Sequence, residues 1–305
     1  MQDGILQLEV CCSTTGRLIV LSLVFSALTI AVLHSQVDDG TDRALPWVIN
    51  TAPPFHIVSG QFRNEGICDV LMDVVDEHLP DYTKTRTVYP QTRITQQFDE
   101  RNQCFPCMIY RPESGNAVFS EPTHFYYPHG VITTKANAAL MKARYGNPIA
   151  LTQLVADDSW RFGYPAGRRY PALQTILESQ SAVGGYRLVH TGENATLAIL
   201  EMIKSNRIDY TIDYQILHQV DLELGGTQLE FIEIKETAGT HVLGAIGCTN
   251  NAWGQQITAA INQHIDQIRR DPRFLANLDR WFQNHPGDKE YLEQLAELVW
   301  QKDSN

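Results

Sequence analysis

Apolar residues recur in two spacings along the chain from residue 46 onward, and the alternation of these spacings predicts an α/β fold. Short runs rich in β-branched and aromatic residues predict strands at 47–50, 85–89, 130–134, 160–164, 186–190, 208–213, 230–234 and 241–246. Apolar residues three and four apart predict helices at 66–79, 91–101, 138–144, 170–179, 194–205, 254–269, 274–283 and 289–300. Two of these helices carry clear apolar stripes, formed by Ile67, Val70, Leu71, Val74 and Val75 and by Ile257, Ile261, Ile265 and Ile268.

The N-terminal region contains an uncharged apolar run, Leu18–Leu33. It is shorter than the ~20 residues that a membrane-spanning helix needs, and its length is typical of a signal-peptide core. We therefore expect residues 1–35 to be a signal peptide, cleaved near Ser35, and 36–45 to be a flexible lead-in. An uncleaved membrane anchor is the alternative. Because acidic residues precede Arg17, we expect the true start to lie nearer Arg17.

The charge of the chain argues against a nucleic-acid partner. The formal net charge is −11, and removal of residues 1–35 leaves about −10. Phosphate backbones repel an acidic protein, and no run of Lys or Arg offsets this charge. The composition is otherwise that of a soluble globular protein.

Four cysteines follow the predicted cleavage site: Cys68, Cys104, Cys107 and Cys248. An exported chain can form disulfides, and four cysteines allow three complete pairings, among which the sequence does not choose. Cys104 and Cys107 also form a Cys-x-x-Cys motif, and a periplasmic thiol–disulfide redox protein is our second hypothesis. That chemistry needs the first cysteine at a helix N-terminus. Here a short segment that favours a strand follows and ends at Pro112, so structural disulfides or buried thiols are the better interpretation.

The order of several segments resembles the family 3 extracellular solute-binding proteins of the polar-amino-acid type. A strand beginning at Trp47, a rigid Pro-Pro-Phe loop ending at Phe55 and a glycine-led helix from Gly66 resemble the family's opening. Three further segments resemble later family motifs: Phe119–Pro122, Arg207–Tyr210 and Trp281–Phe282. Cys248 followed by Trp253-Gly254 is similar to an uncharacterised branch of the family.

This resemblance implies a two-lobe, periplasmic-binding-protein-like fold with a central ligand cleft. The first lobe would comprise 46–130 and 246–305, and the second lobe 136–238. The chain would cross between them near 130–135 and 239–246, and these crossings would act as hinges. The implied function is capture of a small solute by hinge closure, for an ABC-type transporter or a receptor.

Two departures from the family pattern argue against a standard α-amino acid as ligand. The family holds the ligand carboxylate with an Arg in a Thr-Pro-Glu-Arg motif, whereas this chain has Ser114 at the last position. The family holds the amino group with an acid five residues after the Arg-x-Asp aspartate. Counting from Asp209 gives Tyr214, and alternation along a strand directs Asp213 to the opposite face. We therefore expect an anionic or aromatic-bearing solute.

Aromatic candidates for the cleft are Phe55, Tyr110, Tyr127 and Tyr214. The proline pair fixes the loop before Phe55 and directs its ring to the cleft edge, unless the ring plugs the core of the lobe. Tyr110 follows a short apolar stretch and projects from a strand end. Tyr127 belongs to a cluster of aromatic and histidine residues at 124–129, of which one or two line the cleft and the rest form core.

Cationic candidates are Arg111, Arg168 and Arg169. A guanidinium binds a carboxylate through two hydrogen bonds, and Arg111 is placed to do so unless it is a solvated surface residue. Arg168 and Arg169 lie between a strand and a helix, where backbone N–H groups favour anions. We expect one of these two to be exposed.

No hydrolase, phosphate-binding or zinc motif is present, so we expect no enzyme activity, no cofactor and no metal. The expected protein is a periplasmic monomer that binds a small solute and docks to a membrane transporter. A sensor accessory that reports its state to a membrane receptor is the third possibility.

Overall fold

The structure is a computed structural model, and it describes residues 43–98, 100–181, 187–192, 194–283 and 290–300. All of these residues belong to one compact unit. The predicted signal peptide (1–35) and its apolar run Leu18–Leu33 lie outside the described residues. The first strand, β1, begins at Ala44, so the end of the predicted lead-in (36–45) belongs to a strand.

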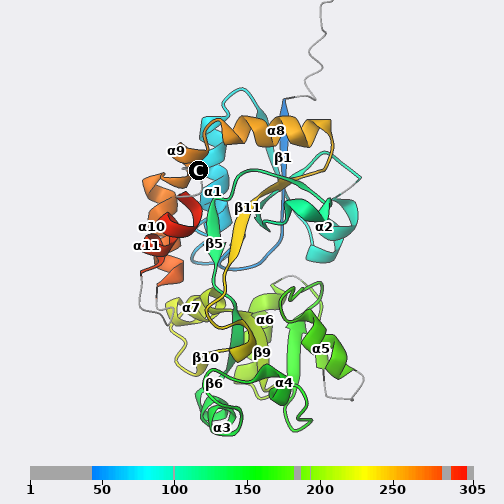
Figure 1. Cartoon of the computed structure of the whole chain (residues 1–305), viewed down its shortest axis with the longest axis vertical. Coiled ribbons are helices and arrows are strands. Elements are labelled where there is room, and N and C mark those ends of the chain that lie inside the picture. The colour runs from blue at the N-terminus through cyan, green and yellow to red at the C-terminus, as the bar shows by residue number, and fades with distance from the viewer. Residues whose placement is uncertain (1–42, 99, 182–186, 193, 284–289, 301–305) are drawn as a thin grey trace, which may run out of the picture. The chain divides into compact units, whose positions relative to one another are not determined.

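The first of two sheets forms the upper lobe in Figure 1. Its strand order is β2-β1-β3-β11-β4, and β5 also pairs with β11. The strands are β1 (Ala44–Ile49), β2 (Thr83–Val88), β3 (Cys104–Ile109), β4 (Val118–Phe119), β5 (His124–Tyr126) and β11 (Val242–Cys248). β1 runs parallel to β2 and β3, whereas β11 runs antiparallel to β3, β4 and β5. A late strand thus completes a sheet that the first part of the chain begins.

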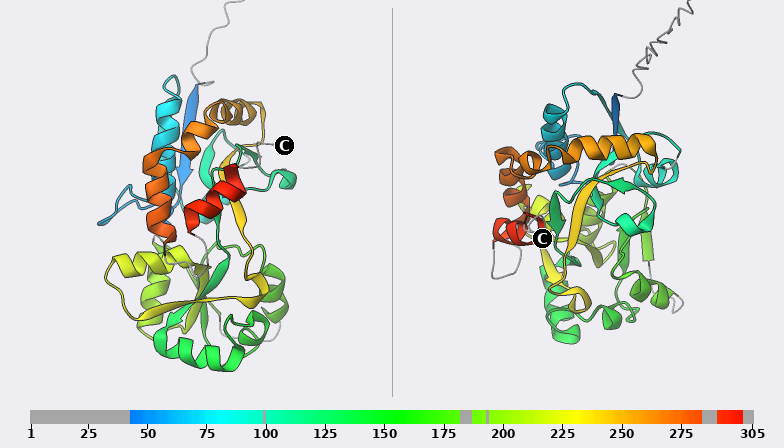
Figure 2. Two further views of the ribbon diagram at one scale, coloured as in Figure 1. Left: turned by 60° about the vertical axis from the view of Figure 1, so that its left-hand side comes forward. Right: turned by 45° about the horizontal axis from the view of Figure 1, so that its top comes forward.

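The helices of this lobe come from both ends of the described chain (Figures 1 and 2). They are α1 (Ile67–His78), α2 (Gln91–Gln97), α8 (Ala252–Asn262), α9 (Ile265–Arg269), α10 (Pro272–Phe282) and α11 (Tyr291–Leu295), with a 3₁₀ turn at Pro112–Ser114 and a π-helical turn at Ala296–Trp300. The predicted stripe of α1 is confirmed, because Ile67, Leu71, Val74 and Val75 are fully buried. The predicted helix 254–269 is wrong as a single element, since the chain turns at His264 and starts a new helix.

The second sheet has the order β10-β6-β9-β7-β8. Its strands are β6 (His129–Thr134), β7 (Phe162–Pro165), β8 (Arg187–His190), β9 (Tyr210–Tyr214) and β10 (Leu229–Glu233). Its helices are α3 (Lys135–Tyr145), α4 (Leu151–Leu154), α5 (Gln174–Ser181), α6 (Ala195–Lys204) and α7 (Gln215–Glu223), with a 3₁₀ turn at Lys235–Thr237. Val131 and Ile132, adjacent on β6, belong to different hydrophobic clusters. Because neighbouring side chains on a strand point to opposite faces, both faces of this sheet are covered.

The chain passes between the two sheets twice. The first passage joins β5 to β6 through Tyr127 and Pro128, and the second joins β10 to β11 through 234–241. The segment 130–135, predicted as the first hinge, lies mostly within β6. The lobe boundaries and the hinge motion stay predictions.

Helix α7 of the second lobe packs against α10 of the first (Figure 2). Ile216 and Val220 of α7 join the large hydrophobic cluster of the first lobe. Arg280 of α10 bridges Glu223 of α7 at 3.2 Å and Glu65 at 2.8 Å. The predictions from sequence omitted α7, although it carries this contact between the lobes.

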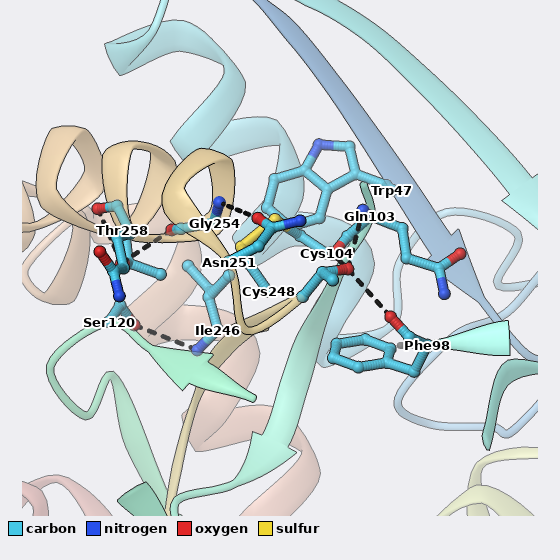
Figure 3. Close-up of a disulfide and its surroundings, with 12 residues drawn as sticks. Trp47, Phe98, Gln103, Cys104, Ser120, Ile246, Cys248, Asn251, Gly254 and Thr258 are labelled. Carbon is cyan, nitrogen blue, oxygen red and sulfur yellow. Dashed lines mark hydrogen bonds between the residues drawn. A yellow bond between two sulfur atoms is a disulfide. The ribbon is translucent and has the colours of Figure 1, made fainter. Parts of the chain in front are cut away.

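The start of α8 is fixed by a side-chain cap. The side-chain oxygen of Asn251 accepts a hydrogen bond from the Gly254 N–H at 2.9 Å (Figure 3). A Cβ at residue 254 would lie 2.0 Å from the carbonyl oxygen of Thr249, so this close approach requires glycine.

Replacing this cap should weaken the fold measurably. We expect Asn251→Ala to lower the free energy of unfolding by about 1 kcal/mol, because alanine leaves the N–H without its acceptor. Urea unfolding of the variant beside Gln255→Ala, an exposed residue of the same helix outside the cap, measures the difference. Equal losses in both variants would contradict the capping role.

Candidate functional site

A cavity of about 520 Å³ lies between the two lobes at the passages of the chain. The first lobe contributes the end of β3 and the start of β11, and the second lobe contributes the segment before α5 and the end of β9. The lining residues are Ile109, Arg111, Tyr127, Pro128, His129, Arg169, Pro171, Ala172, Leu173, Gln174, Tyr214, Thr237, Thr240, His241 and Val242. Its volume lies in the range of small-molecule sites. A ligand in this cavity contacts both lobes and both passages.

The charged residues of the cavity wall are all basic. Arg111 comes from the first lobe and Arg169 from the second, and none of the described lining residues is Asp or Glu. In the part of the chain that the structure describes, neither guanidinium has an ion-pair partner. The cavity is therefore locally positive in a protein whose formal net charge is −11.

Stacked aromatic rings form the inner side of this wall. The ring of Tyr214 stacks on His129 at a centroid distance of 3.9 Å and on Tyr126 at 5.4 Å. Phe55 contacts Tyr126 and Tyr214 edge-on, at 5.6 and 5.8 Å. Burial, chiefly, raises the pKa of Tyr214 to about 12, so its hydroxyl is neutral at physiological pH. Phe55, Tyr126, Tyr214 and His129 thus form an aromatic column that joins residues of both lobes.

An ion pair lies behind these rings. Arg168 donates to the carboxylate of Asp213, and the Arg168 guanidinium also lies 5.2 Å from the ring centre of Tyr214. The side chain of Asp213 is 3% exposed and that of Arg168 is 19% exposed. Burial, the largest single effect, acts to lower the pKa of Arg168, but the charge of Asp213 together with the nearby tyrosine hydroxyls outweighs it and raises the pKa. The guanidinium therefore stays charged beside the carboxylate.

The fold of this chain is similar to that of several solved structures, although its sequence matches no known family. No protein-family model matches the sequence, and no curated protein matches it. Among solved structures, a putative L-cystine ABC transporter protein from Listeria monocytogenes is similar, with a TM-score of 0.61 and 13% identity over 82% of this chain and 99% of that chain. A histidine-bound substrate-binding protein of an ABC uptake transporter from Streptococcus pneumoniae has a TM-score of 0.59 and 12% identity, covering 82% and 96%. An ancestral amino-acid-binding protein, a precursor of cyclohexadienyl dehydratase, has a TM-score of 0.58 and 14% identity, covering 80% and 96%.

The chain has the two-lobe fold of the periplasmic binding proteins. At these identities the similarity establishes the fold, and it confirms the α/β two-lobe architecture that the resemblance implied. Two of these structures are described as binding proteins, one of which is also described as the precursor of an enzyme, and the third is described as a putative ABC transporter.

The binding-protein fold brings together some of the residues that the sequence singled out. Arg111, Tyr127, Arg169 and Tyr214 line the cavity. The phenol oxygen of Tyr127 accepts a 2.9 Å hydrogen bond from Gln294 of α11. Their role in ligand binding stays a prediction.

Three other candidates lie outside the lining. Phe55 packs within the aromatic column, and Tyr110 contacts Phe119 edge-on at 5.6 Å. Arg168 is held by Asp213, whereas Arg169 is exposed, as the sequence predicted for one of the two. The predicted helix 170–179 begins later, at Gln174, so the arginines precede a turn and not the helix itself.

The predicted cluster 124–129 included His129 without singling it out, and the predictions omitted His241 and Asp213 as site residues. The two histidines line the cavity because they stand at the passages between lobes. Asp213 was set aside by the alternation rule, but it lies one residue before the end of β9, where its carboxylate meets Arg168 and accepts the Tyr214 N–H at 2.7 Å. The sequence did contain one signal for Asp213, because it is the only charged residue of the strand β9.

The four cysteines form two disulfides, Cys68–Cys107 and Cys104–Cys248. Figure 3 shows the second of these beside Trp47, beneath the start of α8. The two cysteines of the Cys-x-x-Cys motif therefore belong to different disulfides and lie on β3, not at a helix N-terminus. This arrangement does not favour the redox hypothesis.

None of the helices in the described part of the chain combines the length and the hydrophobicity that a membrane-spanning helix needs. The same described residues contain no group of three or more His, Cys, Asp or Glu side chains placed to hold a metal ion.

Proposed function

We propose that this chain is a solute-binding protein that captures a small anionic solute in the cavity between its lobes. One observation is the main support for this proposal. A single cavity is lined by both lobes and contains two guanidiniums, from Arg111 and Arg169, and none of its described lining residues is acidic. Such a site attracts an anion and holds it between the lobes. A solute that contacts both lobes favours the closed form by its differential affinity for it.

The lining also suits a flat or aromatic group. Tyr127, Tyr214 and His129 present rings to the cavity, next to apolar residues such as Val242. Aromatic walls supply contact area, and the few polar groups fix orientation. The cavity holds no arrangement of nucleophile and base that would support catalysis among its described residues, and we propose binding without chemical conversion.

The disulfides and the similar proteins support a proposal for the location and the partner of this protein. Two disulfides are typical of an oxidising compartment, which supports export to the periplasm. The similar proteins from Listeria monocytogenes and Streptococcus pneumoniae are described as parts of ABC transporters. We propose that this chain likewise delivers its solute to a membrane transporter or receptor.

The test is a thermal-shift screen of the purified protein against small mono- and dicarboxylates, phosphate and sulfate, followed by calorimetric titration of the hits. At a hundredfold excess over Kd a true ligand stabilises the fold by about 2.7 kcal/mol. We expect Arg111→Gln to weaken binding of a hit by about tenfold to a hundredfold, because it removes a charged hydrogen-bond donor. Arg207→Gln, an exposed arginine outside the cavity, is the matched control. Equal affinity in both variants, or no hit in the panel, would contradict the proposal.

A further inference from the structure

The pair of Arg168 and Asp213 sits directly behind the cavity wall. Tyr214 contacts the guanidinium of Arg168 through its ring face, and His129 stacks on the same tyrosine ring. His129 and Tyr214 both line the cavity, so only this layer of rings separates the pair from a bound solute. Tyr170 closes the far side, with its ring 5.3 Å from that of His129.

The polar groups around the pair are incompletely satisfied. Four buried atoms have no hydrogen-bond partner among the described residues: Asp213 Oδ2, Arg168 Nε, His129 Nε2 and Tyr170 Oη. Asp213, His129 and Tyr170 are 2%, 7% and 3% exposed. Buried polar atoms are normally paired, and unpaired ones gathered in one place indicate a site adapted to a ligand or to water.

The charge balance of this region restricts which ligands it accepts. A buried carboxylate needs a cation beside it, and that cation comes either from a side chain of the protein or from a bound solute. Here the chain supplies its own cation, because Arg168 occupies the position beside Asp213. The two remaining guanidiniums at the cavity, those of Arg111 and Arg169, repel a second cation.

We propose that Arg168 is an internal counter-ion that neutralises Asp213 behind the cavity wall, so that the cavity keeps its positive charge and selects for anions without an ammonium group. Arg168 and Asp213 are thus specificity-determining residues. The solute class is a small carboxylate, such as a hydroxy acid, an oxo acid or a dicarboxylate, in contrast to an α-amino acid. This inference rests on the proposed function, since it concerns the solute of the same cavity.

Matched ligand pairs that differ by one amino group test this selection. Glutarate with glutamate, succinate with aspartate, and phenyllactate with phenylalanine each keep the carboxylate and change the ammonium group. Calorimetric titration should show that the wild-type protein binds the member without the ammonium group at least about tenfold more tightly in the pair that fits the cavity. Amino acids bound as tightly as their partners would overturn the inference and leave the proposed function standing.

Substitutions of Arg168 and Asp213 test whether this ion pair causes the preference for solutes without an ammonium group. Arg168→Gln leaves Asp213 without its cation. Burial already raises the pKa of this carboxyl, so it then stays ionised only when a cation lies nearby. We expect the variant to narrow or reverse the preference by about tenfold through improved binding of the amino acid. The double variant Arg168→Gln, Asp213→Asn removes both charges and should lose that gain. Arg207→Gln should keep the wild-type preference. An unchanged preference in Arg168→Gln that remains folded by thermal unfolding would overturn the inference.

Asp213→Asn provides a second measurement that does not depend on the folding of Arg168→Gln. If Arg168 is the resident cation, this variant should bind the anions at least as well as wild type, because one negative charge is gone. Selective loss of amino-acid binding would show instead that a solute ammonium displaces Arg168, and would overturn the inference. If the wild-type protein binds none of the anions, the proposed function fails. In that case a gain of amino-acid binding in Arg168→Gln would still support the counter-ion role of Arg168. The absence of such a gain would reject that role as well.

Discussion

Lowering the pH from 6.5 to 4.5 is expected to destabilise the fold steeply, because His124 and His129 are buried in the neutral form. Burial lowers the pKa of His124 to about 3, and burial together with the charge of Arg168 lowers the pKa of His129 far below its ordinary value. In the unfolded chain both histidines have a pKa near 6.5. Below that pH the unfolded state binds more protons than the folded state, so stability is lost as the pH falls.

The expected slope is about 1.4 kcal/mol of unfolding free energy per pH unit for each histidine, and about 2.7 kcal/mol for both. Urea unfolding between pH 6 and pH 4.5 measures it. His218, whose pKa burial also lowers, adds to this slope, so His124→Gln should reduce it by the share of one histidine, about 1.4 kcal/mol per pH unit. The slope is the readout because the substitution also disturbs the 2.8 Å contact with Thr123 and the 2.7 Å contact with Tyr126. Identical slopes in the two proteins would show that His124 is not buried as a neutral group.

The pH range of this measurement ends at 4.5 because protonation of carboxylates increasingly lowers the free energy of unfolding below that pH. Burial acts to raise the pKa of Asp209, but hydrogen bonds from Arg161 at 2.7, 2.8 and 2.9 Å outweigh it and lower the pKa. A lowered carboxylate pKa contributes stability above the unfolded value near 4, and that stability is lost as the pH falls further. Glu77 and Glu236, whose pKa values are lowered from an ordinary value of 4.5, add to the loss at the lower end of this pH range, so the upper part of the range reports the histidines.

Removal of the Cys104–Cys248 disulfide is expected to have the largest effect of any single change. The two residues are 144 positions apart, compared with 39 for Cys68–Cys107. The loop-entropy relation assigns about 5 kcal/mol to the longer loop and about 4 kcal/mol to the shorter one. Strain and residual structure in the unfolded chain commonly reduce both values.

The paired variants Cys104→Ala, Cys248→Ala and Cys68→Ala, Cys107→Ala compare the two disulfides by urea unfolding. We expect the first pair to lose more stability than the second, and both to unfold at lower urea than wild type. Thiol titration of the unfolded, unreduced wild-type protein gives the control that both disulfides are formed. Reactive thiols from these four cysteines, or losses below about 1 kcal/mol, would contradict the disulfide assignment.

Most regular elements follow from local patterns in the sequence. The stripe of Ile257, Ile261, Ile265 and Ile268 is buried as predicted, although the helix that carries it breaks at His264. Periodicity reports which face of a segment is buried, and it reports less about where one helix stops and the next begins. Helix α7 was missed because its residues mix buried polar groups such as Gln215 and Gln219 with apolar ones, which obscures the pattern.

The site was less predictable because its geometry depends on residues distant in sequence. The sequence identified Arg111 and Arg169, and the structure places both at one cavity. It gave no sign that Asp213 would neutralise Arg168, since the two are 45 residues apart and meet only when β9 and the segment before α5 are adjacent. The cysteine pairing was undetermined for the same reason: spacing along the chain does not report which strands are neighbours.

An experimental structure of the protein with its tightest-binding small anion would test the central claim most directly. The account predicts ligand density in the cavity between the lobes, with the anionic group between the guanidiniums of Arg111 and Arg169 and its other atoms against Tyr214. A second hollow, of about 400 Å³, lies within the first lobe between the end of α1 and α8. Density in that hollow, with the cavity between the lobes lacking the anion, would contradict the account.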